Sequence, residues 1–178
     1  MESGSYRNIE KEVEKHIKEN FMEIKDSGNR REFASGAVRD IDDSKGNTTL
    51  LPLEEVANFL MSKEIHNIQK FKQTGDIGYL YFAISEFNSM HGWSDADSML
   101  ELSKHFAEGM KKYGKDNWKK GIPISSYMDS GIRHYLKVKA GWNDEPHDKA
   151  FIWNLICACW TMNNKPELDD FTEKGCQQ

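Results

Sequence analysis

The stretch EPHDKAFIWNLICACWTM, residues 145–162, decides the fold of this chain. Its middle, AFIWNLICACW, is apolar on nearly every face of a helix, and Pro146 stands near the start, where a helix accepts proline. A helix that is hydrophobic all round must be covered by other elements. The stretch therefore predicts a buried central helix over about residues 145–162, packed among further helices.

Helical spacing of apolar residues recurs along most of the remaining chain. Strand signals are weak throughout, and we find no internal repeat. The sequence therefore predicts an all-α fold, a compact helical bundle in a single domain over residues 1–178. Besides the central helix, the predicted helices cover residues 5–25, a segment from Pro52 to Phe71, residues 77–90, a segment from Ser94 or Asp95 to Gly114, and residues 125–140, capped by Ser125 and stopped by Gly141.

Residues 26–50 interrupt the helical pattern. The segment reads DSGNRREFASGAVRDIDDSKGNTTL and is rich in Gly, Ser, Asn and Asp, without any period. Long loops are uncommon inside compact domains and are often functional. We therefore expect a long ordered loop near residues 26–50, carrying Arg39, Asp40 and Lys45. Its SKGN turn lacks the spacing of a P-loop, so an ordinary turn and a phosphate contact both remain open.

The composition limits the classes of partner. The chain has 178 residues, 30% of them charged, and a net charge of −5. Domains that coat nucleic acid are usually basic, so a nucleic-acid polymer is not an expected partner. No apolar run approaches the roughly 18 residues of a membrane helix, and the N-terminus has no apolar signal-peptide core. We expect a cytoplasmic protein without membrane contact, and the odd count of three cysteines argues against a disulfide framework.

The loop KYGKDNWKKGIP, residues 112–123, concentrates positive charge in an acidic protein. One interpretation is a solvated loop in which Trp118 fills part of the core. The other is one wall of a nucleotide pocket, in which Lys112, Lys119 and Lys120 contact phosphates and Trp118 or Tyr113 stacks on a base. The segment alone does not decide between them.

Two helices near the C-terminal end carry further polar residues. On the first, Asp129 and Arg133 are one turn apart and His134 lies beside them. On the second, His147 and Asn154 share a face. A buried Asn must find partners, since an unsatisfied one costs about 1–3 kcal/mol. It ties helices together or orients a ligand.

These helices suggest two kinds of metal site. His134 with His147 and Asp148 superficially matches a metal phosphohydrolase pattern of His and His-Asp. The thirteen-residue gap is short for that arrangement. Carboxylates on facing helices, holding Mg²⁺ against a phosphate chain, fit the spacing better.

Four segments together resemble a known family. They are FASGAVRD (33–40), SKGNTTLLP (44–52), HFAEGMKKYGKDNWKKGIP (105–123) and YMDSGIRHYLKVKAGWNDEPHDKAFIWN (127–154). In this order they resemble the phage- and prophage-associated dATP/dGTP diphosphohydrolase N-terminal domain family. The resemblance implies a nucleotide-binding domain over residues 33–167, with an insert at residues 61–100. It also implies a relation to all-α, MazG-like, Mg²⁺-dependent pyrophosphohydrolases.

The resemblance assigns roles to residues of this chain. It implies cleavage of a deoxynucleoside triphosphate to the monophosphate and pyrophosphate. On the hypothesis of an enzyme, the catalytic candidates are Glu108, Asp129 and His134, and the candidate ligands of Mg²⁺ are Glu108, Asp129, Asp144 and Glu145. The candidates for nucleotide and phosphate binding are Arg39, Lys45, Lys112, Asn117, Trp118, Lys120, Arg133, His147 and Asn154. The chain departs from the family at Asn47, where an Arg is usual, and it shows no compact MazG-like metal signature.

Three hypotheses therefore remain open. The preferred one is an Mg²⁺-dependent enzyme acting on a deoxynucleoside triphosphate. The second is a non-catalytic phage protein that sequesters a nucleotide-derived immune signal, such as a cyclic nucleotide or a cyclic ADP-ribose derivative. The third is a structural or interaction protein. In each case we expect a homo-oligomer in the cytoplasm, that of the host if a phage encodes the chain.

Overall fold

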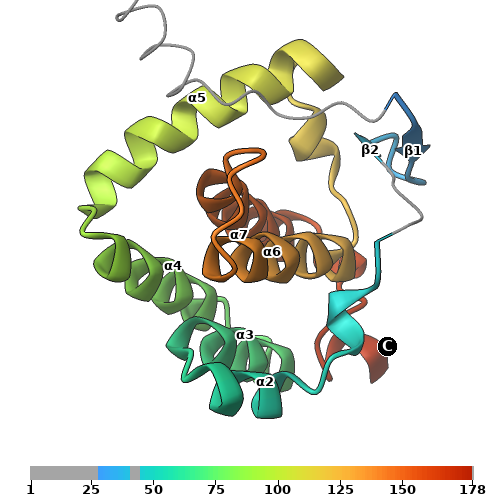
Figure 1. Cartoon of the computed structure of the whole chain (residues 1–178). Coiled ribbons are helices and arrows are strands. Elements are labelled where there is room, and N and C mark those ends of the chain that lie inside the picture. The colour runs from blue at the N-terminus through green and yellow to red at the C-terminus, as the bar shows by residue number, and fades with distance from the viewer. Residues whose placement is uncertain (1–27, 41–44, 178) are drawn as a thin grey trace, which may run out of the picture.

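The structure, a computed structural model, describes residues 28–40 and 45–177. Within these ranges it contains six α-helices and one two-stranded sheet, so the predicted all-α class is confirmed (Figure 1). The predicted helix at residues 5–25 lies outside the described residues. The helices are α2 (Leu53–Leu60), α3 (Lys63–Thr74), α4 (Gly78–His91), α5 (Asp95–Tyr113), α6 (Ile124–Lys139) and α7 (His147–Asn164). The strands are β1 (Arg30–Glu32) and β2 (Val38–Asp40), and the 3-10 turns are η1 (Thr48–Leu50), η2 (Asn117–Lys120), η3 (Pro166–Leu168) and η4 (Gly175–Gln177).

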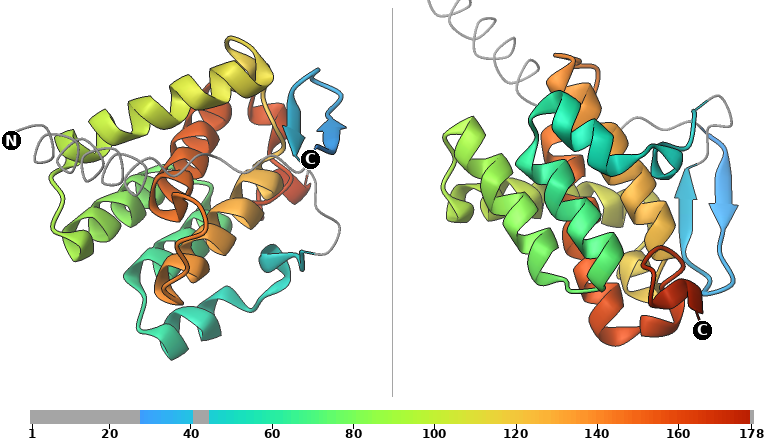
Figure 2. Two further views of the ribbon diagram at one scale, coloured as in Figure 1. Left: turned by 45° about the horizontal axis from the view of Figure 1, so that its top comes forward. Right: turned by 90° about the horizontal axis from the view of Figure 1, so that it is seen from below.

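Helices α6 and α7 form the centre of the bundle. In Figure 1 they lie side by side, and α2 to α5 curve around them on one side while the β1–β2 hairpin lies on the other. Figure 2 shows the same arrangement from two further directions. Phe151, Leu155 and Ala158 of α7 are fully buried, which confirms the predicted central helix.

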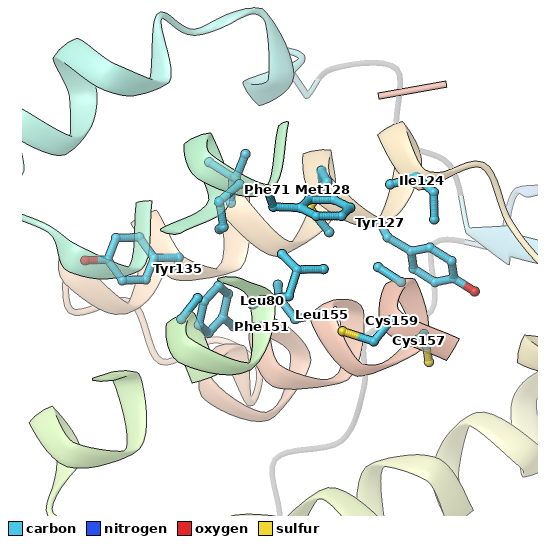
Figure 3. Close-up of a cluster of buried hydrophobic side chains, with 14 of the residues drawn as sticks. Phe71, Leu80, Ile124, Tyr127, Met128, Tyr135, Phe151, Leu155, Cys157 and Cys159 are labelled. Atoms are coloured by element: carbon cyan, nitrogen blue, oxygen red, sulfur yellow. The ribbon is translucent and has the colours of Figure 1, made fainter. Parts of the chain in front are cut away.

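The core joins the central pair to the surrounding helices. Figure 3 shows Phe71 of α3 and Leu80 of α4 beside Met128 of α6 and Leu155 of α7. Each is completely buried. Burying one such side chain contributes about 1.5–3 kcal/mol relative to leaving it exposed, so this cluster supplies much of the driving force for packing.

The close approach of α6 and α7 depends on Gly131. A Cβ atom at this position would lie 3.0 Å from Leu155 Cδ1 and 3.4 Å from Asn154 Cβ. Any larger side chain would push the two central helices apart. Gly131 therefore fixes the distance at which α7 presents Asn154 to the rest of the molecule.

The segment from Pro52 to Phe71 is two helices, and the single helix predicted there is wrong. Met61 adopts a left-handed conformation with φ 49°, which ends α2. Ser62 then caps α3, because its Oγ accepts a hydrogen bond from the backbone N–H of Ile65. Ser62 and Glu64 also bond to the hydroxyl of Tyr135 on α6, at 2.7 and 3.1 Å. This buried polar cluster anchors the start of α3 on the central pair.

The long loop predicted near residues 26–50 is partly wrong, because β1 and β2 form an antiparallel hairpin in which Arg30 is opposite Asp40. Gly36, with φ +75°, makes the tight turn between them. Strands of three residues are too short to produce a visible alternation, which explains why the pattern predicted none. Residues 41–44 lie outside the described ranges, and η1 follows them.

The remaining helix boundaries agree with the sequence except at one cap. Ser94 caps α5, and α6 ends before Gly141, as predicted. Ser125 is not the cap of α6, since Pro123 occupies that position. The N–H and Oγ of Ser125 instead donate to the Asp170 carboxylate, at 2.8 and 2.6 Å. No helix in the described ranges is long and apolar enough to cross a membrane.

We predict that Gly131→Val lowers the free energy of unfolding by about 1–3 kcal/mol, because the added methyl groups would overpack the α6–α7 contact. Gly109→Ala on α5 is the matched control, since a Cβ there meets nothing within 4 Å. It should raise stability by up to about 1 kcal/mol. Urea unfolding of both variants measures this, and equal stability of Gly131→Val and the parent would contradict the close packing.

Candidate functional site

A large pocket opens between the hairpin, η2 and helices α5, α6 and α7. Its volume is about 1530 Å³, above the roughly 300–1,000 Å³ of ordinary small-molecule sites. Of the residues predicted for the site, ten line it: Arg39, Lys45, Asn117, Trp118, Asp129, Arg133, His134, Asp144, Glu145 and Asn154. Glu108, Lys112, Lys120 and His147 are not among the described lining residues.

Arg39 of β2 extends its guanidinium across the pocket. It donates to the backbone carbonyl of Ser126 at 3.1 Å and to Oδ1 of Asn154 at 2.6 Å. The rings of Tyr127 and Trp153 lie 5.8 and 5.9 Å from its Cζ. Burial lowers the pKa of Arg39 from its ordinary value, which means that desolvation of its charge is only partly compensated. None of the ion pairs between described residues involves Arg39.

Asn154 is the buried polar residue for which the sequence allows either a structural role or a role in ligand binding. Its Nδ2 donates to the carbonyl of Ala150 at 2.7 Å, and its Oδ1 accepts from Arg39. Both ends of the amide are therefore satisfied. Asn154 positions Arg39 at the pocket wall.

Asp129 of α6 is held by two neighbours. Its Oδ1 accepts from the backbone N–H and the hydroxyl of Thr48, at 2.6 and 2.9 Å, and its Oδ2 pairs with Arg133. Thr48 also donates to the carbonyl of Asp129 at 2.7 Å. Asp129 thus fixes η1 against α6, and both its oxygens already have partners.

The lysine-rich loop fastens the hairpin to the bundle. The side-chain amide of Asn117 accepts from the N–H of Val38 at 2.9 Å and donates to its carbonyl at 2.8 Å, as a neighbouring strand would. Lys120 donates to the carbonyl of Gly36 at 3.0 Å, and Lys112 forms an ion pair with Asp40. These contacts give Asn117, Lys112 and Lys120 structural roles beside any role with a ligand.

Trp118 belongs to an aromatic cluster at the pocket wall. Its ring meets Phe106 and Trp160 edge-on, at centroid distances of 5.4 and 5.2 Å, and Lys119 lies over it at 5.4 Å. Trp142, which also lines the pocket, is 58% exposed. Trp142 is therefore more accessible for stacking on a base than Trp118.

The pocket residues that were not predicted for the site include His105, Trp142 and Trp153. Trp153 directly precedes Asn154 in the segment that carries the family resemblance, so its position was available as a signal. Trp142 follows Gly141 at the end of α6, where no periodic pattern marks it. His105 lies on α5 and is the first residue of the family-like segment 105–123, but no spacing singles it out there.

His105 is a buried group without a hydrogen bond at Nδ1 among the described residues. It is 8% exposed and lines the pocket. Burial, and then the charges of Lys149 and Arg39, lower the pKa of His105 to about 4. The imidazole is therefore neutral at pH 7, with one polar atom unsatisfied. Buried groups of this kind are rare in native proteins and call for an explanation.

Two histidines meet at one end of the pocket. Nδ1 of His134 on α6 lies 3.0 Å from Nδ1 of His147 on α7. Oε1 of Glu145 is 3.4 Å from the His147 Nδ1 and 3.9 Å from the His134 Nδ1, and Asp144 contacts His147 Nε2 at 2.7 Å. Burial, followed by the charge of His147, holds the pKa of His134 well below its usual range.

The four carboxylates predicted to hold Mg²⁺ are not brought to one centre. Among the described residues, the group of three or more ligand atoms within 4.8 Å of one another consists of His134, Glu145 and His147. Asp129 is engaged with Thr48 and Arg133, and Glu108 lies outside the pocket lining. The residues present do not form an oxygen-only cage for Mg²⁺.

Comparison with known protein families gives a match over part of the chain. Residues 87–171 match the family model described as dATP/dGTP diphosphohydrolase, N-terminal. The match confirms the resemblance inferred from the sequence over the segment from the end of α4 to Phe171. The hairpin with Arg39 precedes this segment. No curated protein and no solved structure matches the chain.

The pKa of His105 predicts a pH dependence of stability. Because it falls from 6.5 to about 4 on folding, its contribution is fully present above pH 6.5 and is lost as pH falls through about 4. At pH 4.5 the loss is about 2–3 kcal/mol. His105→Gln should remove this part of the dependence. Urea unfolding of both proteins at pH 7.5 and 4.5 measures the difference, and parallel losses would contradict it.

Proposed function

We propose, from the premise that residues 87–171 form a dATP/dGTP diphosphohydrolase N-terminal domain, that this chain hydrolyses a deoxynucleoside triphosphate to the monophosphate and pyrophosphate. The observation that supports the proposal best is the environment of Arg39. Arg39 is a cation in a large pocket, and its hydrogen-bond partners are neutral oxygens. Such a group favours an anionic ligand.

The chemistry of Arg39 suits a phosphate. A guanidinium carries five N–H donors in a planar fork, and the bonds to Ser126 and Asn154 take two of them. Arg and phosphate form paired, charge-assisted hydrogen bonds of matching geometry. Because the pocket is partly desolvated, an incoming phosphate would interact with Arg39 more strongly than it would in water.

The rest of the pocket suits a nucleotide. Its volume accommodates a base, a sugar and a phosphate chain. Trp142 offers an exposed ring, and Lys137 lies 5.2 Å from that ring at the pocket wall. Stacking on aromatic rings is worth about 1–3 kcal/mol per base and tolerates any base. The neutral imidazole of His105 supplies a further hydrogen-bonding atom.

Of the predicted catalytic residues, His134 has the best position for proton transfer. It lines the pocket, and its lowered pKa keeps the imidazole neutral at pH 7, so that in the protein without a bound metal ion a ring nitrogen can accept a proton from water. Glu108 and Asp129 stay predictions. Mg²⁺ also stays a prediction; it would arrive with the triphosphate and neutralise its charge.

Sequestration is the second candidate, and one observation favours it. The carboxylates that would hold Mg²⁺ are dispersed, and Asp129 already serves the packing of η1. A pocket with cations and aromatic rings but no carboxylate centre would suit the binding of a nucleotide-derived signal without its cleavage. The ligand would be a cyclic nucleotide or a cyclic ADP-ribose derivative.

One experiment separates the two candidates. The purified chain is incubated with deoxynucleoside and nucleoside triphosphates and with cyclic nucleotides, in Mg²⁺ or in EDTA, and the products are resolved by chromatography. Monophosphate and pyrophosphate formed only with Mg²⁺ support hydrolysis. A ligand that is depleted and returns intact after heat denaturation supports sequestration. If no compound is either hydrolysed or depleted, the result would contradict a nucleotide pocket.

Arg39→Gln is predicted to weaken nucleotide binding. The loss of a hydrogen bond to a charged group costs about 1.5–3 kcal/mol, so the Kd should rise roughly 10- to 150-fold. Lys63→Gln is the control for charge, because Lys63 is exposed and pairs with Glu86 away from the pocket. Calorimetric titration with a non-hydrolysable triphosphate measures both, and equal affinities would show that Arg39 does not bind phosphate.

The sequence-based assignment of Glu108 and Asp129 to catalysis predicts that Glu108→Gln and Asp129→Asn each lower the rate of hydrolysis by at least about 100-fold. Asp129→Asn also weakens the bonds to Thr48 and Arg133, so its melting temperature must be measured beside its activity. Turnover retained by both folded variants would remove these residues from the catalytic assignment.

A further inference from the structure

We propose that His134, Glu145 and His147 form a site for one divalent transition-metal ion of the Zn²⁺ class. The three side chains come from α6, from the segment before α7 and from the first residue of α7. The inference goes beyond the proposed hydrolysis and does not rest on it, because the site is defined by protein atoms alone.

The distances between the three ligand atoms suit such an ion. They are 3.0 Å between the two Nδ1 atoms, and 3.4 and 3.9 Å from these atoms to Oε1 of Glu145. Atoms bound to tetrahedral Zn²⁺ at about 2.0–2.2 Å stand about 3.3–3.6 Å apart. Shifts of about half an ångström or less would bring all three to bonding distance. Ordinary side-chain adjustment covers this.

Asp144 sets the protonation of His147 for metal binding. Its Oδ1 lies 2.7 Å from Nε2 of His147, which places the proton on Nε2 and leaves the lone pair on Nδ1. Carboxylates in this position orient metal-bound histidines and raise their basicity. An arrangement of this kind is found around protein-bound zinc. Asp144 is therefore a positioning residue of the site.

His134 then has one simple way to accept the ion. With a lone pair on Nδ1 of His147, the contact of 3.0 Å is a hydrogen bond from N–H of His134. When the ion enters, the proton of His134 leaves Nδ1, and Nε2 takes up a proton. The imidazole of His134 stays neutral, and both Nδ1 lone pairs point at the metal.

The charges around the three residues are compatible with a divalent ion. Lys137 lies 3.4 Å from Oε1 of Glu145, and Arg39 also raises the local positive potential. Glu145 and Asp144 supply negative charge beside His147. Lys137 must give up part of its contact with Glu145, and the ion gains two imidazoles and one carboxylate in exchange.

The ligand set distinguishes this site from the predicted Mg²⁺ site. Imidazole suits Zn²⁺ and its neighbours in the first transition series, whereas Mg²⁺ prefers oxygen ligands. Three protein ligands leave a tetrahedral ion with one further position, as in zinc sites that bind water or substrate. His134 and Glu145 line the pocket, so an ion bound to them would border the pocket as well.

The test is calorimetric titration of the full chain with Zn²⁺, without nucleotide, after treatment with a chelator and without a histidine tag. All proteins carry Cys176→Ser, because the exposed Cys176 thiol would bind Zn²⁺ by itself. We expect one ion per chain. At a free Zn²⁺ concentration 100 times the Kd, the melting temperature should rise by about 5–10 °C. Co²⁺ should give the intense visible absorption of a four-coordinate site.

Substitution of the proposed ligands tests whether the bound Zn²⁺ ion occupies this site. His134→Gln and Glu145→Gln should each weaken Zn²⁺ binding by at least about 100-fold, and Asp144→Asn by about 10- to 100-fold. His91→Gln is the matched control, a histidine of α4 that lies outside the pocket lining and outside the group of three. Its affinity for Zn²⁺ should equal that of the parent. His134 is preferred to the fully enclosed His147 for substitution, because its side chain is 17% exposed.

Two results would overturn the proposal. One is the absence of stoichiometric Zn²⁺ binding, which leaves only a hydrogen bond between the two histidines. The other is binding that His134→Gln and Glu145→Gln do not weaken. These outcomes are independent of the hydrolysis assay, since an inactive protein that binds Zn²⁺ through these residues would keep the site and lose only the proposed function.

Discussion

The guanidinium of Arg39 imposes the constraint on which the pocket depends. A cation removed from water needs oxygen partners, and this one finds them on α6 and α7, at Ser126 and Asn154. The requirement draws β2 against the central helix pair. It also accounts for the polar Asn154 within a helix that is otherwise apolar. Because both partners are neutral, the positive charge of Arg39 is only partly compensated. An anionic ligand in the pocket would interact with this charge.

The surrounding polar contacts hold the parts of the pocket in register. Asn117 copies the hydrogen bonding of a strand against Val38, and Asp129 fastens η1 to α6 through Thr48. Most of these bonds join a side chain to a backbone atom far away in the sequence. Asn117 and Asp129, which belong to the family-like segments, thus also hold together the elements that surround the pocket.

Most helices could be predicted from the sequence, but the break between α2 and α3 and the short hairpin could not. The apolar run around Phe151 predicted the central helix, because all-round hydrophobicity has one stable solution. The break at Met61 depends on one left-handed residue, and the hairpin on strands of three residues, which leave no period to detect. Ten of the residues predicted from the sequence line the pocket, but spacing could not show that Asp129 is committed to Thr48 or that His105 is buried near the charge of Arg39.

The long sequence separation between Arg39 and Asn154 has a consequence for folding. The two residues are 115 positions apart, whereas α6 and α7 are neighbours joined by a short connection. Contacts of high sequence separation carry a greater loop-closure cost and tend to form after local ones. The central pair is thus the natural nucleus, and the hairpin docks on it late. Late-docking elements are also the first to open, so the pocket exchanges its backbone amides sooner than the core, and an occupant that bridges hairpin and helices would slow that exchange.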